Sequence, residues 1–300
     1  MSGFTEADVP GQLGKCFIVT GANAGIGFEA AKLLARKGAR VLLGCRDADK
    51  AAAAIALIGP GVDVAHLPLD LADLASVRTA AEIAAQEPRL DGLINNAGVM
   101  FPPLTRTAQG FELQWGVNHL GHFALTALLL LKLAEAPGAR VVVTASLAHQ
   151  RGNIQWHDLD AKQGYKRSDR YSDSKLANML HFAELDRRLR AAGSPVTALG
   201  CHPGVAATEL MRHSGAFQVL TPLFGLFLNT SAMGAWPALQ AACDPAAIAG
   251  AYYGPQGLGG MRGKSGEAKR SAAAQDPELA RRLWDVSAQM TGIDPGLAPA

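Results

Sequence analysis

Two side chains, Tyr171 and Lys175, have the types and the spacing needed to move a proton. The run from Tyr171 to Arg190 has the apolar spacing of an amphipathic helix, on which residues four apart lie on one face. A tyrosine alone is a poor acid or base near neutrality because its ordinary pKa is about 10, but a nearby ammonium group lowers that pKa. The pair could therefore exchange a proton with a carbonyl or alcohol oxygen. The same spacing also arises by chance in surface pairs, so the rest of the chain decides between these interpretations.

A glycine-rich turn follows the first strand-like run, KCFIVT at residues 15–20. Gly21 allows a tight turn, Gly25 lets the backbone approach a pyrophosphate, and Gly27 lets the following helix pack closely on the sheet. The amino end of that helix offers free N–H groups to an anion. This arrangement predicts a dinucleotide site.

Apolar, strand-like runs alternate with helical patterns along most of the chain, which predicts an α/β fold built on a Rossmann-type doubly wound parallel sheet. Right-handed crossovers would then bring the carboxyl ends of the strands to one edge, where ligands bind. We expect strands over residues 15–20, 39–44, 62–68, 90–95, 139–145 and 195–200, and helices up to residue 36 and over 51–58, 74–86, 110–134, 171–190 and 277–290. Residues 252–266 are expected to form a loop, and the tail 291–300 to be flexible.

Length and composition agree with one domain over residues 1–300, because 300 residues with 49% hydrophobic content can bury a full core. The net charge of +2 gives no reason to expect nucleic acid or an anionic membrane as a partner. The cysteines, Cys16, Cys45, Cys201 and Cys243, are scattered, which indicates free thiols in a reducing compartment and no metal site. We therefore expect a cytoplasmic protein.

No membrane segment is expected either. Residues 1–14 are polar and lack the apolar centre of a signal peptide. The apolar runs 123–133 and 216–228 are both shorter than the roughly 18–20 residues of a spanning helix.

The end of the second strand bears on which dinucleotide binds. An acidic residue there would bind the ribose of NAD, whereas an arginine accommodates the 2′-phosphate of NADP. Cys45 fills that position, and Arg46 follows it. Asp47 could instead cap the next helix or pair with Arg46. The pattern favours NADP(H) over NAD(H), with a solvated Arg46 as the alternative.

Together these residues resemble the short-chain dehydrogenase/reductase family. The matching pieces run in the family's order from residue 15 to about 210, and three stretches, 41–50, 114–122 and 171–180, look most like its retinol-dehydrogenase-like branch. The pieces are TGANAGIG at 20–27, Asp70, NNAG at 95–98, Asn118, Ser146, Tyr171, Lys175, Pro203, Gly204 and Thr208.

The resemblance implies a role for each of four catalytic residues. Ser146 would hydrogen-bond the substrate oxygen, and Tyr171 would give or take its proton. Lys175 would lower the pKa of the tyrosine and hold the nicotinamide ribose. Asn118 would kink its helix and position a water that links Lys175 to solvent.

The resemblance also implies a set of cofactor-binding residues. Asp70 would contact the adenine, the backbone of residues 96–98 would line the adenosine side, and residues 203–208 would lie against the nicotinamide. The full set is Gly21, Asn23, Gly25, Ile26, Gly27, Arg46, Asp70, Leu71, Asn96, Ala97, Gly98, Lys175, Pro203, Gly204, Val205 and Thr208.

Residues 205–235 occupy the place of the family's substrate lid and are rich in Phe and Leu. This favours a lipophilic ketone or aldehyde and its alcohol as substrates, although the segment could instead pack on the core or on a partner subunit. The predicted function is an NADP(H)-dependent oxidoreductase. A reductase of a conjugated C=C bond and a catalytically silent NADP-binding sensor are the alternatives, and a homodimer or homotetramer is open.

Ser146 and Tyr171 lie 25 positions apart, which is a longer interval than in many family members. The polar residues 150–170 in this interval predict a surface excursion beside the site. His149, Trp156 and His157 would allow a metal or substrate site there, but such residues in a polar segment usually belong to the surface.

The assignment of Arg46 leads to a test of cofactor choice. Arg46→Ala should weaken NADPH binding far more than NADH binding, because a guanidinium can donate two hydrogen bonds to a phosphate that NADH lacks. Dissociation constants for both cofactors, measured by fluorescence titration, check this. Equal losses for the two cofactors would overturn the assignment.

Overall fold

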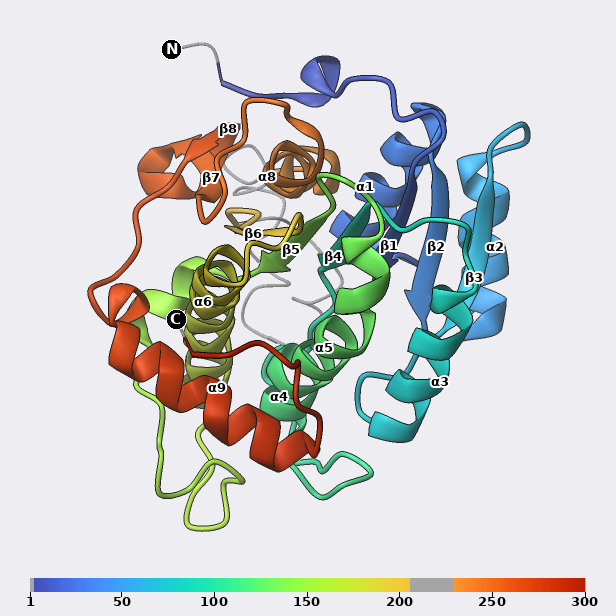
Figure 1. Ribbon diagram of the computed structural model, residues 1–300. Coiled ribbons are helices and arrows are strands. Elements are labelled where there is room, and N and C mark those ends of the chain that lie inside the picture. The colour runs from blue at the N-terminus through green and yellow to red at the C-terminus, as the bar shows by residue number, and fades with distance from the viewer. Residues whose placement is uncertain (1–2, 206–228, 300) are drawn as a thin grey trace.

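The chain folds around one eight-stranded sheet in the computed structural model, which describes residues 3–205 and 229–299 (Figure 1). The strand order is β3-β2-β1-β4-β5-β6-β7-β8, and neighbours run parallel except β7 and β8, which are antiparallel. The strands are β1 (Cys16–Thr20), β2 (Arg40–Cys45), β3 (Val64–Pro68), β4 (Gly92–Asn95), β5 (Arg140–Thr144), β6 (Thr197–Cys201), β7 (Tyr252–Gly257) and β8 (Arg262–Glu267). The predicted single-domain, doubly wound α/β fold is confirmed.

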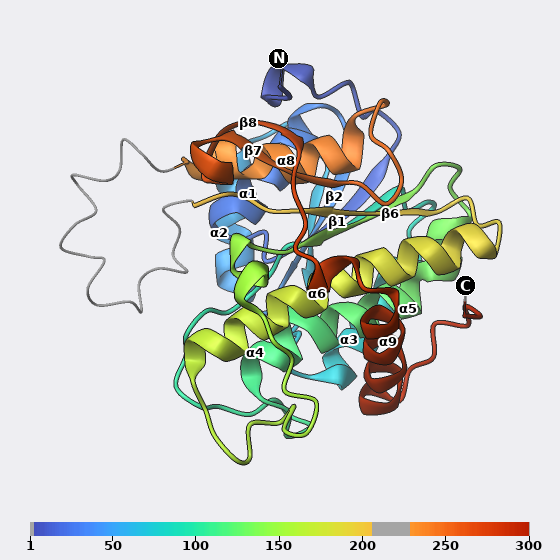
Figure 2. The same ribbon diagram turned by 90° about the vertical axis from the view of Figure 1, so that its left-hand side faces the viewer.

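Helices cover both faces of the sheet (Figures 1 and 2). One face packs against α1 (Gly25–Arg36), α2 (Ala48–Ile58) and α8 (Ser231–Cys243), and the other against α3 (Leu74–Ala85), α5 (Gly121–Ala134) and α6 (Arg167–Ala191). Within β1, Phe17 and Val19 pack into the core on the side of α1, α2 and α8, and Ile18 packs into the core on the opposite side. Both faces of the strands are therefore buried, which explains why the strand sequences are apolar throughout.

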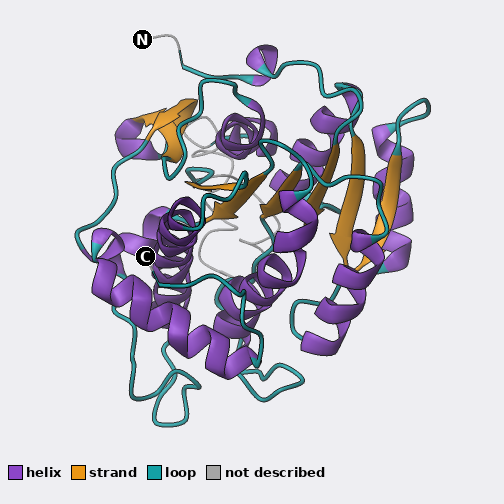
Figure 3. Ribbon diagram, viewed as in Figure 1, coloured by secondary structure: helices purple, strands orange, loops and turns teal. Residues whose placement is uncertain are grey.

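The remaining elements are short helical turns and the last helix of the chain, and Figure 3 shows how helices and strands alternate with loops. The last helix, α9, packs across the outside of α6. These elements are η1 (Glu6–Asp8), α4 (Leu113–Trp115), η2 (Gly116–Leu120), η3 (Leu147–Arg151), η6 (Leu258–Gly260), η7 (Ala273–Gln275) and α9 (Pro277–Thr291).

The strand order reverses at β1. After β3 the chain crosses back to place β4 on the other side of β1, so the loops that follow β1 and β4 leave the sheet in opposite directions. Ligands of open α/β sheets bind in the crevice at such a switch point. The predicted phosphate turn follows β1, and the NNAG segment follows β4.

The helix predicted over residues 110–134 starts at Leu113 and contains a π-helical turn, η2. Asn118 lies in this turn, in agreement with its expected position in an irregular helix. The stretch Leu113–Ala134 is 22 residues long and apolar enough to cross a membrane by length and composition. However, 72% of its most apolar window is buried inside the protein, and the core helix of a soluble protein passes the same test.

Two expectations for the second half of the chain were incomplete or wrong. Residues 252–266, predicted to be a loop, form the β7–β8 hairpin, and α8 was not predicted. The glycines that suggested a loop are needed for packing: a Cβ on Gly254 would lie 1.9 Å from Nε2 of His202. Tertiary contact therefore overrides the local preference of this segment.

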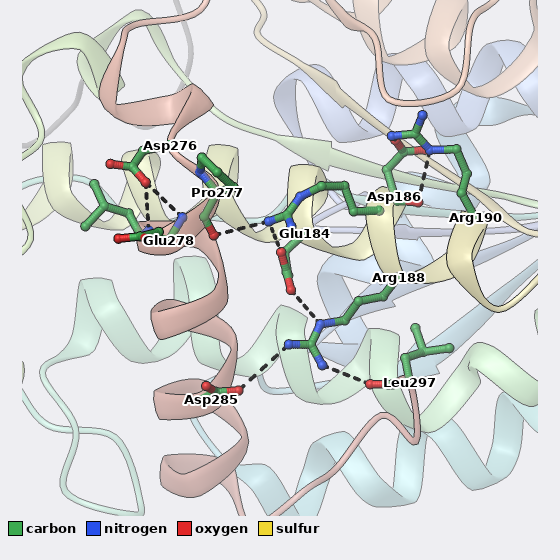
Figure 4. Close-up of polar contacts among 11 residues, drawn as sticks. Glu184, Asp186, Arg188, Arg190, Asp276, Pro277, Glu278, Asp285 and Leu297 are labelled. Atoms are coloured by element: carbon green, nitrogen blue, oxygen red, sulfur yellow. Dashed lines mark hydrogen bonds and ion pairs between the residues drawn. The ribbon is translucent and has the colours of Figure 1, made fainter. Parts of the chain in front are cut away.

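The C-terminal tail, predicted to be flexible, is attached to α6 as far as Leu297 (Figure 4). Nη1 of Arg188 donates to the Leu297 carbonyl at 2.9 Å, and its Nε donates to Glu184 at 2.6 Å. The Arg188 guanidinium also lies 4.5 Å from the ring centroid of Trp284 on α9. Ile293, between the helix and Leu297, is buried.

Buried neutral histidines make acid stability a test of this fold. Burial lowers the pKa of His122 to about 4 and of His181 to about 3, below the value of about 6.5 expected in the unfolded chain. Above pH 6.5 both states are neutral and there is no effect. As pH falls from 6.5 towards 4, only the unfolded state takes up protons, so the free energy of unfolding should fall by about 1.4 kcal/mol per histidine and pH unit.

Urea unfolding between pH 7 and pH 4 measures this slope. His181→Phe should flatten the slope because it removes one buried titratable ring. Neither ring nitrogen of His181 has a hydrogen-bond partner among the described residues, so the substitution breaks no hydrogen bond there. His157→Phe, at an exposed position, is the matched control and should leave the slope unchanged. A slope identical in all three proteins would contradict the assignment.

Candidate functional site

The turn after β1 has the backbone that a phosphate-binding turn requires. Gly21 and Gly25 have positive φ angles of 67° and 59°. A Cβ on Gly27 would lie 2.5 Å from both the Gly21 carbonyl oxygen and Nδ2 of Asn96. Gly27 is therefore closely packed, as predicted. Its neighbours, however, are the turn itself and the segment after β4 rather than the strands of the sheet.

The amino end of α1 fits an anion. Ala24 stands at the cap position and has no side chain that could accept from the first N–H groups, and the first turn holds no acidic residue. The N–H groups at the start of a helix lack intrahelical partners and carry its positive dipole end. This geometry fits the pyrophosphate of a dinucleotide bound beside Gly25 and Ile26, with Asn23 in the preceding turn.

Thr20 joins the two loops that meet at the switch point. Its hydroxyl oxygen accepts from the N–H groups of Asn96 and Ala97, both at 2.9 Å, and its carbonyl accepts from the side chain of Asn96. Nε2 of His122 lies 2.9 Å from the same hydroxyl, and Nδ1 of His122 lies 3.1 Å from the Asn118 carbonyl. A carbonyl can only accept, so Nδ1 donates and Nε2 accepts from Thr20.

At the end of β2, the described contacts separate the roles of Arg46 and Asp47. The Asp47 carboxylate caps α2 by accepting from the Lys50 N–H at 3.0 Å. The Arg46 side chain is 76% exposed and lies 4.0 Å from Asp70, the residue predicted to contact adenine. Leu71 is buried, and its carbonyl leaves no room for a Cβ on Gly121.

Asn118 and Lys175 occupy the centre of the predicted catalytic site. The Asn118 side chain accepts from the Val99 N–H at 2.8 Å and donates to the Val99 carbonyl and to the Ser174 hydroxyl, both at 3.0 Å. The Lys175 ammonium donates to the Thr144 carbonyl at 3.2 Å. An ammonium has three N–H donors, and among the described residues only the Thr144 carbonyl accepts a hydrogen bond from it. Lys175 also lies beside Gly98, where a Cβ would be 3.6 Å from Nζ.

Tyr171 and Ser146 lie together beside this centre. Tyr171 is buried, and burial raises its pKa to about 12, while its hydrogen bond with the Ser146 side chain opposes that rise. Nζ of Lys175 lies 5.8 Å from the tyrosine ring centroid, and burial lowers the pKa of the ammonium to about 8. The expectation that Lys175 would lower the pKa of Tyr171 is therefore not met by the chain alone, because burial disfavours both charged forms.

The predicted nicotinamide loop is held from two sides. Gly204 has a φ of 74°, and a Cβ there would lie 2.3 Å from the Met261 carbonyl, which also accepts from the Val205 N–H at 3.0 Å. The buried Asn229 donates to the carbonyls of Val205 and Pro203, both at 2.9 Å. Thr208 and the apolar lid residues 217–228 lie outside the described residues.

Two residues that position this site, His122 and Asn229, were not singled out from the sequence, and Thr20 and His149 were named there only as part of the glycine motif and as a possible metal or substrate residue. His122 follows Asn118 by four residues and His149 follows Ser146 by three, so helical spacing from a predicted catalytic residue was an available signal. Nδ1 of His149 lies 2.6 Å from the Ser146 carbonyl, and its Nε2 accepts from the Ser271 N–H. Both nitrogens are used, so the metal alternative for His149 has no support. No group of three or more His, Cys, Asp or Glu side chains among the described residues could hold a metal ion.

The described surroundings of Tyr171 and Ser146 are partly apolar. The Phe101 ring meets the Tyr171 ring nearly at right angles, with centroids 5.4 Å apart. Leu258 and Met261, on the β7–β8 turn, are exposed. This turn reaches the site at Gly260, where a Cβ would lie 3.4 Å from Leu147, next to Ser146.

Comparison with known proteins agrees with this geometry. The model of the short chain dehydrogenase family matches residues 15–218. The chain therefore belongs to the short-chain dehydrogenase/reductase family and to its retinol-dehydrogenase-like branch, and it is an NAD(P)-dependent oxidoreductase of alcohols or carbonyls. It is similar to human retinol dehydrogenase 11, with 43% identity over 286 residues that cover 93% of this chain and 86% of that protein.

Two solved structures are also similar. An uncharacterized protein from Mycobacterium paratuberculosis is 39% identical, with a TM-score of 0.83 over 99% of this chain and 100% of that one. A protein from Beutenbergia cavernae, described as an NAD(P)-dependent gluconate 5-dehydrogenase with bound NADP at low occupancy, is 26% identical. It has a TM-score of 0.58 and covers 78% of this chain and 91% of that one.

The close packing at Gly27 leads to a test of the phosphate turn. Gly27→Ala should raise the dissociation constant for NADPH by at least about tenfold, because the new Cβ must displace the Gly21 carbonyl or Asn96. Gly11→Ala is the matched control, since a Cβ at Gly11 has no atom within 4 Å. Fluorescence titration measures both. Unchanged affinity in Gly27→Ala would argue against a phosphate at this turn.

Proposed function

We propose that this protein is an NADP(H)-dependent oxidoreductase that interconverts a lipophilic ketone or aldehyde and its alcohol, with Tyr171 as the general acid and base. The observation that carries the proposal is the pair of buried side chains Tyr171 and Lys175, one helical turn apart on α6, with the Ser146 side chain near enough to oppose the rise in the pKa of Tyr171. The pair lies at the switch point of the sheet, beside the glycine turn. This is the place where a bound dinucleotide and a substrate oxygen would meet.

Hydride transfer to and from the carbonyl carbon is the chemistry that the nicotinamide supplies when bound. The protein's part is to bind and orient. The hydroxyls of Ser146 and Tyr171 donate to the substrate oxygen and stabilise negative charge on it. Tyr171 then gives its proton to that oxygen, or takes it in the reverse direction. The Lys175 ammonium has donors left for a ribose hydroxyl, while Asn118 holds the π-helical turn against the Val99 segment.

The proposed cofactor set combines backbone and side chains. The turn containing Gly21, Asn23, Gly25, Ile26 and Gly27 would hold the pyrophosphate, and Asp70, Leu71, Asn96, Ala97 and Gly98 would line the adenosine side. Pro203, Gly204, Val205 and Thr208 would face the nicotinamide. Lys175 would bind its ribose.

Three points support NADP(H) over NAD(H). Cys45 stands where an acidic residue would select NAD, and the Asp47 carboxylate is engaged as the cap of α2. Arg46 is exposed beside Asp70, so its guanidinium is available for a 2′-phosphate. The similar protein from Beutenbergia cavernae has bound NADP.

A lipophilic substrate is supported by the Phe101 ring beside Tyr171 and by the similarity to retinol dehydrogenases. The intact Ser146 favours carbonyl chemistry over the reduction of a conjugated C=C bond. The complete set of Asn118, Ser146, Tyr171 and Lys175 argues against a silent NADP-binding sensor. A reducing, cytoplasmic compartment is part of the proposal and agrees with the four free, buried cysteines.

Tyr171→Phe tests the acid and base role. The variant should lose turnover by at least about a thousandfold while the dissociation constant for NADPH stays within about twofold, because only the proton-carrying oxygen is removed. NADPH oxidation against a panel of lipophilic aldehydes and ketones, followed optically, measures turnover.

In the wild-type protein, alcohol oxidation should accelerate with rising pH, because Tyr171 must lose its proton before it can act as a base.

The control for Tyr171→Phe is Tyr253→Phe, which removes a hydroxyl that accepts from the Ile248 N–H away from the site. It should retain turnover. Wild-type rates in Tyr171→Phe would sink the proposed role. Tight NADPH binding with no carbonyl turnover in the wild-type protein would shift the assignment to C=C reduction or to a sensor.

A further inference from the structure

Phe101 has a backbone conformation that a bulky residue rarely adopts. Its φ is 58°, in the left-handed region, and it lies in the loop that follows β4. A bulky L-residue keeps this conformation only when its surroundings impose it, and such residues gather at functional sites. Two other non-glycine residues with positive φ are Ala161 and Leu258 among the described residues. Of the three, Phe101 is the one whose ring packs against Tyr171.

The Phe101 ring adjoins the predicted acid and base. Its centroid lies 5.4 Å from that of Tyr171, at an interplanar angle of 76°. Phe101 is only half-buried, whereas the aromatic residues that fill the core, such as Phe17 and Phe123, are almost fully buried. The ring therefore packs against Tyr171 on one side and remains accessible on another.

A hydrogen-bonded brace holds the Phe101 loop. Oε1 of the fully buried Gln114 accepts from the Phe101 N–H at 3.0 Å. Nε2 of Gln114 donates to the Tyr165 hydroxyl at 3.2 Å and to the Arg167 carbonyl at 3.0 Å, so the orientation of the amide is defined. The Tyr165 hydroxyl in turn donates to the Pro102 carbonyl at 2.8 Å.

Tyr165 belongs to the polar excursion over residues 150–170. A buried ion pair anchors this segment, in which Nη2 of Arg170 lies 2.9 Å from the Asp158 carboxylate. The Asp158 carboxylate also accepts from the N–H groups of Lys162 and Gln163. The excursion is therefore ordered against the start of α6, and through Tyr165 it supports the loop that carries Phe101.

We propose that Phe101 is a specificity-determining residue that favours a carbonyl attached to a flat, unsaturated group, and that the excursion holds it in place through Tyr165. The inference rests on the proposed function. A substrate whose oxygen contacts the hydroxyls of Ser146 and Tyr171 brings the groups on its carbonyl carbon next to the Phe101 ring. Aromatic rings favour offset or edge-on contact with other flat π systems, beyond simple burial, by an amount equivalent to about threefold to tenfold in rate.

The test uses two aldehydes with the same number of carbon atoms, benzaldehyde, which is flat, and cyclohexanecarbaldehyde, which is puckered. Neither carries a C=C bond next to the carbonyl that a double-bond reductase could reduce. Phe101→Leu should lower the benzaldehyde to cyclohexanecarbaldehyde ratio of kcat/KM about threefold to tenfold relative to wild type. Differences in intrinsic reactivity cancel in this comparison. The dissociation constant for NADPH should stay within about twofold.

Tyr165→Phe tests the brace separately. It removes one oxygen atom, and with it the bond to the Pro102 carbonyl and the acceptor for Gln114. It should shift the same ratio in the same direction by a smaller factor, about twofold to threefold. Tyr253→Phe, which removes a hydroxyl remote from this loop, should leave the ratio unchanged.

Melting temperatures identify variants that do not fold, and Tyr165→Phe carries the test if Phe101→Leu fails to fold. An unchanged ratio, or an equal loss for both aldehydes, would overturn the specificity role while leaving the proposed function intact. A wild-type protein that reduces neither these nor any other carbonyl would overturn both. The two failures are therefore distinguishable.

Discussion

The burial of the Lys175 ammonium is the constraint around which the site is built. The side chain is only 4% exposed, and removing a cation from water is costly unless polar groups replace its hydration. The Thr144 carbonyl at the end of β5 supplies one acceptor, and Asn178 donates to the same carbonyl at 3.0 Å. Burial also places the ammonium beside Tyr171 and Gly98. The same desolvation disfavours the charged forms of both Lys175 and Tyr171.

A chain of hydrogen bonds connects Ser174, the neighbour of Lys175 on α6, to Thr20 at the end of β1. Thr20 holds the segment after β4, His122 links Thr20 to the Asn118 carbonyl, and the Asn118 side chain holds the Val99 segment against α6. The side chains of Thr20, Asn118, His122 and Ser174 are buried, so each partner lost there would leave an unsatisfied polar atom in a region of low dielectric. One network therefore joins the segment after β4, the π-helical turn and α6 to the end of β1.

The excursion between Ser146 and Tyr171 shows how a polar segment can become structural. From composition it resembles a solvated loop, yet Asp158 and Arg170 form a buried ion pair and Tyr165 reaches the loop after β4. The β7–β8 hairpin behaves in a similar way: its glycines suggest a loop, but Gly254 makes room for His202, and the Met261 carbonyl of the hairpin fills the space beside Gly204. In both segments the decisive partners are distant in sequence, and local composition contains no information about them.

The sequence by itself determined the α/β alternation, the glycine turn, and the spacing of Tyr171 and Lys175, because these depend on residue type and on neighbours within one or two helical turns. It also indicated that Asp47 could cap α2. Only the tertiary structure decided the β7–β8 hairpin, the anchoring of Leu297, the roles of Thr20 and His122, and the high pKa of Tyr171. These features arise from long-range pairing and from burial, which depend on where the chain folds back on itself rather than on any local pattern.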